Sequence, residues 1–306
     1  MKRVKLILLA SCLLPALAGA QEVANASFLD LTPDAQSAGM GGTGLATTDN
    51  GSIAIFHNAS TIAFSEEVMG GTYSYADIDR GGAIHSASLF YRIGREGKHG
   101  FTVGYRHFKQ ADYGVEGIDL YRPRAWALEA AYFRTIAKNL SALQTKVDKR
   151  VDSENTFCVD LGASYHRNMA ILDEYASWTI GFQAANLGPK LDGQKLPARL
   201  GLGGSVDLPF SMDHELQVAL DLNYLLPSEY RHLQAGIGAE YSFLKYGVAR
   251  AGYHFGDKDK GVGNYGTLGC GVRFWPIPVR ADFSYALGSK TSFMRNAWQV
   301  SVAVVL

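Results

Sequence analysis

The sequence predicts an all-β fold class: a 14-stranded antiparallel transmembrane β-barrel with a short N-terminal plug in its lumen. Three observations support this prediction. The chain begins with a secretory leader, apolar and polar residues alternate from about residue 68 to residue 306, and the 306 residues include 34 glycines and 16 tyrosines. Alternation with a period of two is typical of strands. After the leader, no stretch reaches the roughly 18 consecutive apolar residues of a membrane helix.

Composition limits the possible function classes. The 29 Lys and Arg residues balance the 29 Asp and Glu residues, so there is no basic excess to neutralise phosphates, and we exclude nucleic acid as a partner. Hydrophobic residues make up 47% of the chain, which excludes intrinsic disorder. The expected surroundings of such a barrel are outer-membrane lipid.

Residues 1–20 form the first predicted segment, a cleaved signal peptide. Lys2, Arg3 and Lys5 precede an apolar stretch, and Ala18-Gly19-Ala20 matches a cleavage site. A lipoprotein leader with a lipidated Cys12 is the alternative. Export of a barrel predicts the bacterial cell outer membrane as its location.

Two further cysteines, Cys158 and Cys270, lie beyond the leader. An even pair in an exported protein can form a disulfide, which is one interpretation. The strand pattern favours two cysteines that form no disulfide, because it places them on opposite faces of distant strands.

Residues 21–67 form the second predicted segment, an N-terminal plug. Thr32 and Pro33 are expected to begin a short helix, as N-cap and first-turn residue, which ends in the glycine-rich run 39–44. The apolar residues of this segment need burial, and the lumen is the remaining place because the strands already supply the lipid face. We expect the plug to close the barrel from its periplasmic end. The expected plug residues are Phe28, Leu29, Gly39, Met40, Gly41, Gly42 and Asn58.

Residues 68–306 form the predicted barrel domain. Each expected strand has about 10 residues, the length that a tilted membrane strand needs. The clearest alternation spans residues 216–226, where every even position is apolar. The expected strands are 68–77, 84–93, 100–109, 125–136, 139–147, 156–166, 175–187, 197–208, 213–226, 230–243, 246–255, 264–274, 278–287 and 296–306.

The number of strands decides which face looks outward. Fourteen strands enclose a lumen too wide for apolar side chains to fill, so the apolar face should meet lipid. Val218, Leu220 and Leu222 should then face lipid and Asp221 the lumen, while tyrosines near strand ends form an aromatic girdle. A soluble β-sandwich with tyrosine-rich strands is the alternative.

The opposite face of the strands should line the lumen with polar residues. Six acidic and five basic residues nearly balance, which indicates cross-lumen ion pairs and hydrogen bonds, or else simple solvation of a channel wall. The expected lumen polar network is Arg106, Glu129, Asp160, Arg199, Asp207, Asp221, Glu240, Arg250, Arg273, Arg280 and Asp282.

The connections between strands predict an orientation. If both ends of the barrel domain are periplasmic, the longer connections face outward and the tight ones lie in the periplasm. The longest outer connection, 110–124, contains Tyr113, Tyr121 and Arg122 as a candidate outer-loop contact surface. An ordinary solvated loop is the alternative.

The motifs of enzymes are missing or out of context. Residues 39–44 and 261–266 both match G-x-G-x-x-G, but neither follows a buried strand and opens a helix, as dinucleotide binding requires. The eight histidines lack H-E-x-x-H spacing, and no serine lies in G-x-S-x-G. We therefore expect a non-enzymatic protein without catalytic residues, metal or cofactors.

Several motifs resemble those of the PorV/PorQ family, a branch of the FadL-like outer-membrane barrels. Phe56-His57-Asn58-Ala59 stands where that family has an aromatic residue or histidine before Asn-Pro-Ala. The other similar stretches, in chain order, are Phe28-Leu29-Asp30-Leu31-Thr32-Pro33-Asp34-Ala35, Gly39-Met40-Gly41-Gly42, Leu45-Ala46, Val159-Asp160-Leu161-Gly162, Ala185-Asn186-Leu187-Gly188-Pro189-Lys190, Leu196-Pro197-Ala198-Arg199-Leu200-Gly201 and Arg250-Ala251-Gly252-Tyr253-His254-Phe255.

The resemblance implies a non-enzymatic barrel that takes part in type IX protein secretion or in the surface attachment of cargo. Its implied partners are type IX secretion subunits and the C-terminal signal domains of cargo proteins. The alternative function is a FadL-like channel for long-chain fatty acids or other hydrophobic small molecules.

Overall fold

The computed structural model describes residues 27–49, 51–78, 82–94, 98–109, 124–137, 140–151, 154–171, 174–191, 193–244, 246–274, 276–288 and 294–306. The expected signal peptide and the outer-loop residues Tyr113, Tyr121 and Arg122 lie outside the described residues.

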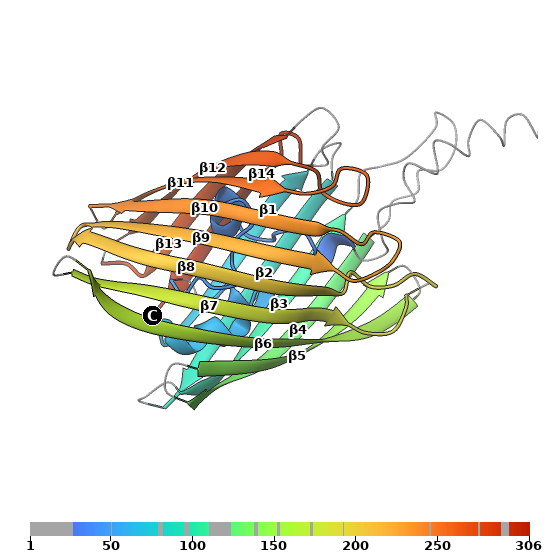
Figure 1. The fold of residues 1–306 in the computed structure, drawn as a ribbon, viewed down its shortest axis with the longest axis horizontal. Coiled ribbons are helices and arrows are strands. Elements are labelled where there is room, and N and C mark those ends of the chain that lie inside the picture. The colour runs from blue at the N-terminus through green and yellow to red at the C-terminus, as the bar shows by residue number, and fades with distance from the viewer. Residues whose placement is uncertain are drawn as a thin grey trace, which may run out of the picture.

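Within these ranges, four short helices precede fourteen strands (Figure 1). The helices are η1 (Ser27–Leu29), α2 (Ala35–Gly39), η2 (Ala54–Phe56) and η3 (Ala59–Phe64). The strands are β1 (Met69–Ile78), β2 (Gly82–Ile93), β3 (His99–Lys109), β4 (Arg124–Ala137), β5 (Leu140–Val151), β6 (Glu154–Ile171), β7 (Glu174–Leu187), β8 (Arg199–Ser211), β9 (His214–Leu225), β10 (Leu233–Phe243), β11 (Gly247–Phe255), β12 (Tyr265–Phe274), β13 (Val279–Gly288) and β14 (Trp298–Val305).

Each described strand pairs antiparallel with its neighbour in sequence, and β1 also pairs with β14, so that the sheet closes on itself. The prediction of an all-β antiparallel fold is confirmed. Strand bounds agree with the predicted ones within a few residues, except that β6 continues to Ile171 instead of ending near 166. Its main-chain ladder with β7 extends to Ile171↔Glu174, because backbone pairing does not require the side-chain alternation that stops near Arg167.

The strands expose their apolar face and bury their polar face. The exposed fractions are 37% for Val218, 47% for Leu220 and 37% for Leu222, but only 2% for Asp221. The predicted assignment of faces is therefore confirmed. A β-sandwich is excluded, because its apolar faces would be packed against each other instead of lying exposed around the sheet.

Tyrosines lie on the same outward face as the apolar residues. Of these tyrosines, Tyr285 is half-exposed, and the exposed ones include Tyr91, Tyr132, Tyr165, Tyr224, Tyr241 and Tyr253. Cys158 and Cys270 form no disulfide with each other: Cys158 is buried inside and Cys270 is exposed outside, on opposite faces as predicted.

The outward face leads to the first testable prediction. Replacing Leu220 by arginine should lower the free energy of unfolding by about 2–4 kcal/mol in a bilayer, because the charge would lie in lipid near the middle of β9. Unfolding by denaturant in liposomes measures this cost. The control is Met212→Arg, in the β8–β9 turn with 91% of its side chain exposed, where we expect less than about 1 kcal/mol. Equal costs at both positions would contradict the assignment of faces.

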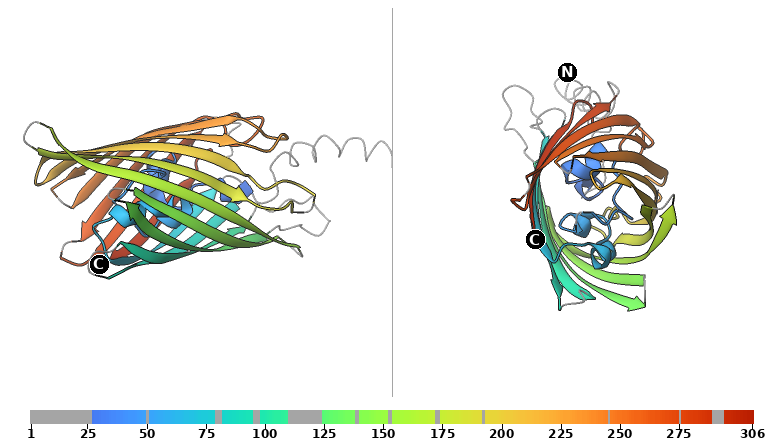
Figure 2. Two further views of the ribbon diagram at one scale, coloured as in Figure 1. Left: turned by 60° about the horizontal axis from the view of Figure 1, so that its bottom comes forward. Right: turned by 90° about the vertical axis from the view of Figure 1, so that its left-hand side faces the viewer.

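The N-terminal residues lie inside the barrel. Figure 2 shows the short blue helices enclosed by the strands when the barrel is seen from one end. Helix α2 contacts β11, β12, β13 and β14, whereas η3 contacts β3, β4, β5 and β6, so the two elements pack against different parts of the wall. We call residues 27–67 the N-terminal segment.

The N-terminal segment runs along the inside of the barrel from one end to the other. We call the end where β1 begins and β14 ends the C-terminal end, and the opposite end the distal end. Phe28 packs with Ile78, Ile84 and Phe108 at the distal end, whereas Glu67 lies beside β1 at the C-terminal end. The expectation that the segment closes the barrel from its periplasmic end stays a prediction, and the structure adds that the segment extends through the interior between the two ends.

The structure also corrects the predicted helix start. Asp34, and not Thr32, is the N-cap of α2: its backbone is extended and its side chain accepts the N–H of Ser37. Pro33 accordingly precedes the cap instead of occupying the first turn. A carboxylate satisfies the free N–H groups of a helix start at least as well as a hydroxyl does.

Among the described residues, no helix has the length and hydropathy needed to cross a membrane. Across the same part of the chain, no group of three or more His, Cys, Asp or Glu side chains is placed to hold a metal ion.

Candidate functional site

The candidate functional site is the contact between the N-terminal segment and the inner wall of the barrel. Its local framework is a hydrogen-bonded pair within the segment. Asp34 Oδ1 accepts the N–H of Ser37 at 2.8 Å, and Asp34 Oδ2 lies 2.9 Å from His57 Nε2. Both side chains are buried, so this pair connects the start of α2 with the end of η2 away from solvent.

Glycines let the backbone of the segment approach the wall. Gly41 has φ +71°, and a Cβ there would lie 2.7 Å from the carbonyl oxygens of Ile237 and Tyr253. A side chain at this position would therefore be strained and would also collide with β10 and β11. Of the predicted plug glycines, Gly39 and Gly41 are buried and Gly42 is half-buried.

The wall supplies hydrogen-bond partners to the backbone of the segment. Thr267 Oγ1 accepts the N–H of Gly41 at 3.0 Å and donates to the carbonyl of Gly39 at 2.9 Å. Ser301 Oγ accepts the N–H of Ala35 at 2.8 Å. A buried irregular segment needs such partners, because its polar groups have lost water.

Asp221 attaches the middle of the segment to the wall through two hydrogen bonds. Its Oδ2 accepts the N–H groups of Gly44 at 2.7 Å and Leu45 at 3.0 Å. The sequence predicted Asp221 as a residue of the lumen wall, but the structure adds that it binds a segment 176 residues away in the chain. Bonds to a charged acceptor are stronger than neutral ones.

A second prediction concerns this attachment. Asp221→Asn replaces a charged acceptor by a neutral one, which should weaken the two bonds by about 1 kcal/mol and speed hydrogen exchange at Gly44 and Leu45 about fivefold. Mass spectrometry of exchange in detergent measures this. Asp207→Asn is the matched control, because among the described residues Asp207 accepts hydrogen bonds from the wall residues Ser177 and Gln217 and from none of the segment. Equal acceleration in both variants would show that Asp221 does not hold the segment.

Two arginines of the predicted network also bind the segment. Arg199 Nη1 lies 2.9 Å from Asp30 Oδ1, and Gln234 donates to the other oxygen of Asp30 at 3.0 Å. Arg280 donates to the carbonyl of Asp49 at 2.7 Å and pairs with Glu67. The sequence prediction missed Asp30 and Glu67 as partners, although acidic side chains in an otherwise apolar buried segment were a usable signal.

A buried arginine holds the distal half of the segment. Arg106 Nε donates to Glu129 at 2.6 Å, and its Nη1 donates to the carbonyl of Leu29 at 3.1 Å. Its guanidinium also lies 5.0 Å from the ring centroid of Phe56. One wall residue therefore contacts both η1 and η2.

Arg250 forms the centre of a second buried ion cluster. Its Nε lies 2.7 Å from Glu240 Oε2, and its Nη1 lies 2.6 Å from Asp282 Oδ1. Arg273 Nη2 approaches the other oxygen of Glu240 at 3.1 Å. Gly39 packs beside Arg250, since a Cβ on that glycine would lie 3.3 Å from Arg250 Cδ. The cluster therefore underlies α2.

The last two network residues bind polar wall groups. Asp160 Oδ1 accepts the N–H of Asn186 at 2.7 Å, and Asp207 accepts from Ser177 and Gln217 at 2.7 Å each. All eleven predicted residues line the interior, but their ion pairs run along the wall or to the segment. The expectation of pairs across the lumen is wrong, because the segment occupies the space between opposite walls.

The predicted plug residues all belong to this contact. Phe28 stacks on Phe108 with ring centroids 5.8 Å apart, and Leu29 and Met40 are buried. Asn58 caps η3 and donates to the carbonyl of Leu45 at 3.0 Å and to Ser164 at 3.1 Å. The asparagine thereby joins two turns of the segment to the wall.

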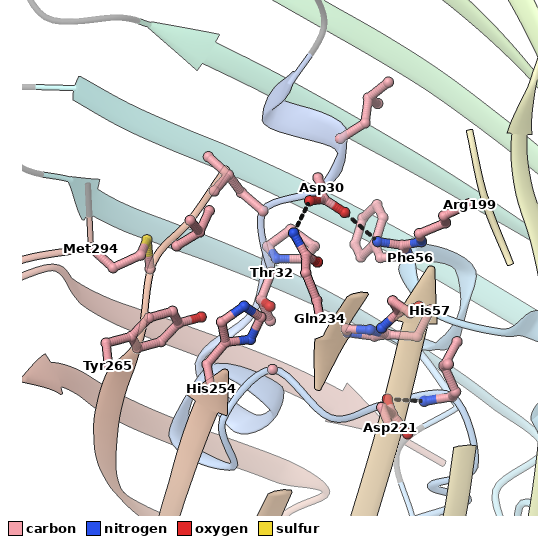
Figure 3. Close-up of a pocket in the computed structure, with 17 residues that line it drawn as sticks. Asp30, Thr32, Phe56, His57, Arg199, Asp221, Gln234, His254, Tyr265 and Met294 are labelled. Atoms are coloured by element: carbon pink, nitrogen blue, oxygen red, sulfur yellow. Dashed lines mark hydrogen bonds and ion pairs between the residues drawn. The ribbon is translucent and has the colours of Figure 1, made fainter. Parts of the chain in front are cut away.

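Two cavities adjoin the segment. A small inner cavity of about 40 Å³ lies among Asp30, His57, Asp221 and His254 (Figure 3). A polar cavity of about 520 Å³ lies at the C-terminal end and includes Glu67. Burial raises the pKa of Glu67 above its ordinary value, although the charge of Arg280 opposes this rise.

The outer surface has a third hollow, on the outward side of β1, β2 and β3. This groove encloses about 960 Å³ and is lined almost wholly by apolar atoms. Small residues such as Gly71 and Ala87 form its floor, between Leu89 and Tyr105.

Comparison with known proteins shows a likeness of fold. No protein-family model matches the chain, and no curated protein matches its sequence. The solved structure of the toluene transporter TodX of Pseudomonas putida superposes with a TM-score of 0.55 at 13% identity, over 88% of this chain and 95% of TodX. The monoaromatic hydrocarbon channel CymD gives a TM-score of 0.55 at 13% identity, over 89% and 97% of the two chains. At such identities the likeness is one of fold.

Proposed function

We propose that this chain is a plugged, fourteen-stranded outer-membrane barrel that admits hydrophobic small molecules into the bacterial cell. The protein is non-enzymatic in this proposal, and the N-terminal segment acts as its plug. The observation that carries the proposal is the likeness of fold to a toluene transporter and a monoaromatic hydrocarbon channel over nearly the whole length of each chain. The exposed apolar face of the strands supports placement in lipid.

The contacts of the segment support its role as a plug. Its apolar side chains are held in the lumen by a moderate number of polar attachments, chiefly those of Asp221, Arg199 and Arg106. Hydrogen bonds of this kind each contribute only about 1–3 kcal/mol. Part of the segment can therefore shift without unfolding of the barrel, which rests on its own strand ladders.

Besides the lumen, the proposal includes a route for an apolar molecule through the barrel wall beside β3. The outer groove over β1, β2 and β3 is backed on the inside by a cluster that includes Ile55, Phe56 and Phe90. Gly104 separates the two sides, and a Cβ there would lie 2.8 Å from the ring of Phe56. Apolar surfaces thus approach each other from both sides of a thin wall.

The proposal is tested by measuring toluene uptake when the N-terminal segment is bonded to the barrel wall. Ala35→Cys with Ser301→Cys is designed to bond α2 to β14, since the Ala35 N–H donates to Ser301 Oγ at 2.8 Å and the two residues are adjacent. Cells that make the protein should accumulate toluene faster than cells without it. If the segment must move, oxidation should slow uptake and reductant should restore it, with either single-cysteine variant as control. Uptake equal to that of cells without the protein would contradict the proposed function.

A second candidate function is the export role implied by the PorV/PorQ resemblance. The filled lumen favours it, since a barrel that acts through its rim and outer loops needs no passage. Its partners would be type IX secretion subunits and the C-terminal signal domains of cargo. Affinity purification from outer membranes tests this candidate, which fails if neither kind of partner is recovered with the barrel.

A further inference from the structure

We propose that the inner cavity is a binding site for the hydroxyl group of an otherwise hydrophobic molecule, an alcohol or a phenol. This inference rests on the proposed function as a route for small hydrophobic molecules, and it specifies their chemical class. A pure hydrocarbon and a carboxylate are both poorer ligands for this site.

The cavity lies where the segment, the wall and the distal connections meet. The N-terminal segment contributes Asp30, β9 contributes Asp221 and Asn223, and β11 contributes His254 (Figure 3). Met294, from the connection between β13 and β14, covers one side. The site is therefore assembled from parts of the chain that only the folded barrel brings together.

Four buried polar atoms around this cavity have no hydrogen-bond partner within the described protein: Asp221 Oδ1, Asn223 Oδ1, His254 Nε2 and Arg199 Nε. Unpaired buried polar atoms are uncommon, and each one costs about 1–3 kcal/mol. All four belong to residues that line this one small cavity, so a polar ligand bound there is the shared partner that the inference assigns to them.

The unpaired atoms define the hydrogen bonds that a ligand must make. Asp221 and Asn223 offer oxygen acceptors, and Arg199 offers an N–H donor. His254 Nε2 also has no partner among the described residues, and a neutral imidazole nitrogen either donates or accepts one hydrogen bond, depending on the tautomer. A hydroxyl group donates one hydrogen bond and accepts others, so it satisfies both kinds of atom at once.

The charges around the cavity disfavour an ionised ligand. Asp30 and Asp221 contribute two carboxylates against the one guanidinium of Arg199. Arg199 already pairs with Asp30, so a carboxylate ligand would meet a net negative wall. An ammonium ligand would meet the Arg199 donor and lose the bond that a hydroxyl oxygen accepts.

The volume of the inner cavity limits which part of a ligand can enter without movement of the protein. About 40 Å³ holds a hydroxyl group and its carbon, whereas a cavity of about 150 Å³ is needed for benzene. The hydrophobic body of the ligand must therefore displace an apolar neighbour. Met294 is suited to this, because an unbranched methionine adapts its shape readily.

A series of four one-ring probes tests the inference: benzyl alcohol, toluene, benzoate and benzylamine. Binding to the purified full-length barrel in detergent is measured by equilibrium dialysis. We expect benzyl alcohol to bind at least about tenfold more tightly than each of the others, because a site built for a hydroxyl discriminates strongly against analogues without it. Equal or tighter binding of toluene, benzoate or benzylamine would overturn the inference.

Variants connect the preference to the cavity. Asn223→Leu and His254→Leu should each remove most of the preference for benzyl alcohol over toluene. Gln183→Leu is the matched control, since Gln183 is a buried wall residue that does not line this cavity. A preference that survives both cavity variants, each verified as folded by its heat-dependent mobility on a gel, would also overturn the inference.

Failure of the proposed function is distinguishable from failure of this inference. If toluene uptake by cells does not depend on the protein while benzyl alcohol binds selectively, the cavity is a binding site and the transport proposal fails. If uptake depends on the protein but all four probes bind equally, transport stands and the hydroxyl preference fails.

Discussion

Replacing Arg250 by methionine is expected to lower the free energy of unfolding by about 3–5 kcal/mol. The substitution leaves the carboxylates of Glu240 and Asp282 buried, with side-chain exposures of 4% and 6%, and removes the charge that both contact. Arg273 still approaches Glu240, but Asp282 has no second ion pair among the described residues. Denaturant unfolding in liposomes measures the loss.

An exposed ion pair of the same protein is the control for this prediction. Lys195 lies 3.3 Å from Glu229, and the two side chains are 43% and 59% exposed. Lys195→Met should therefore cost less than about 1 kcal/mol. Adding Glu240→Gln and Asp282→Asn to Arg250→Met should recover part of the lost stability. A triple variant as unstable as the single one would show that unpaired charge is not the cause.

Deleting residues 27–44 is expected to convert a barrel that is closed to ions into one with a steady open-channel current. These residues include η1 and α2, and their side chains fill the lumen between Phe108 and the wall at β11–β14. Their removal leaves a lumen lined by charged and polar residues, which water and ions can enter. Planar-bilayer recording of the two proteins measures the difference.

The intact protein provides the decisive comparison for this prediction. A steady, large current before any deletion would contradict the plug. Gly41→Val provides an independent test, because its Cβ would collide with the carbonyls of Ile237 and Tyr253 and should push the segment from the wall. We expect intermittent current from this variant. Gly94→Val is the control, since Gly94 also has a positive φ but no atom lies within 4 Å of an added Cβ.

Most of the strand arrangement could be predicted because it depends on local pattern. Successive side chains of a strand alternate between two faces, so the sequence around Leu220 and Asp221 predicts both faces once the number of strands is known. Pairing between neighbours such as β9 and β10 then follows from short connections. β6 is the exception, since its ladder continues past the point where alternation ends.

For the N-terminal segment, the sequence predicted that its residues are buried but not which residues they contact. Its apolar side chains and glycines indicated burial close to a wall, and the plug residues do lie there. The partners could not be read from the sequence: Asp30 and Arg199 are 169 positions apart, and Asp49 and Arg280 are 231 apart. No periodic pattern relates residues at such separations.

The sequence by itself determined the all-β class, the strands, their outward and interior faces and the burial of the N-terminal segment. Each of these features depends on residues that are close together in the chain. Alternation of apolar and polar side chains predicts the strands and their faces, and apolar side chains are buried because burial removes them from water. Only the tertiary structure decided that the segment runs from Phe28 at the distal end to Glu67 at the C-terminal end. It also decided that Asp221 binds Gly44 and Leu45, and that four unpaired polar atoms surround one cavity. The reason is physical: closure of the sheet brings distant strands to a common interior, where hydrogen-bond partners are set by proximity in space and not by order along the chain.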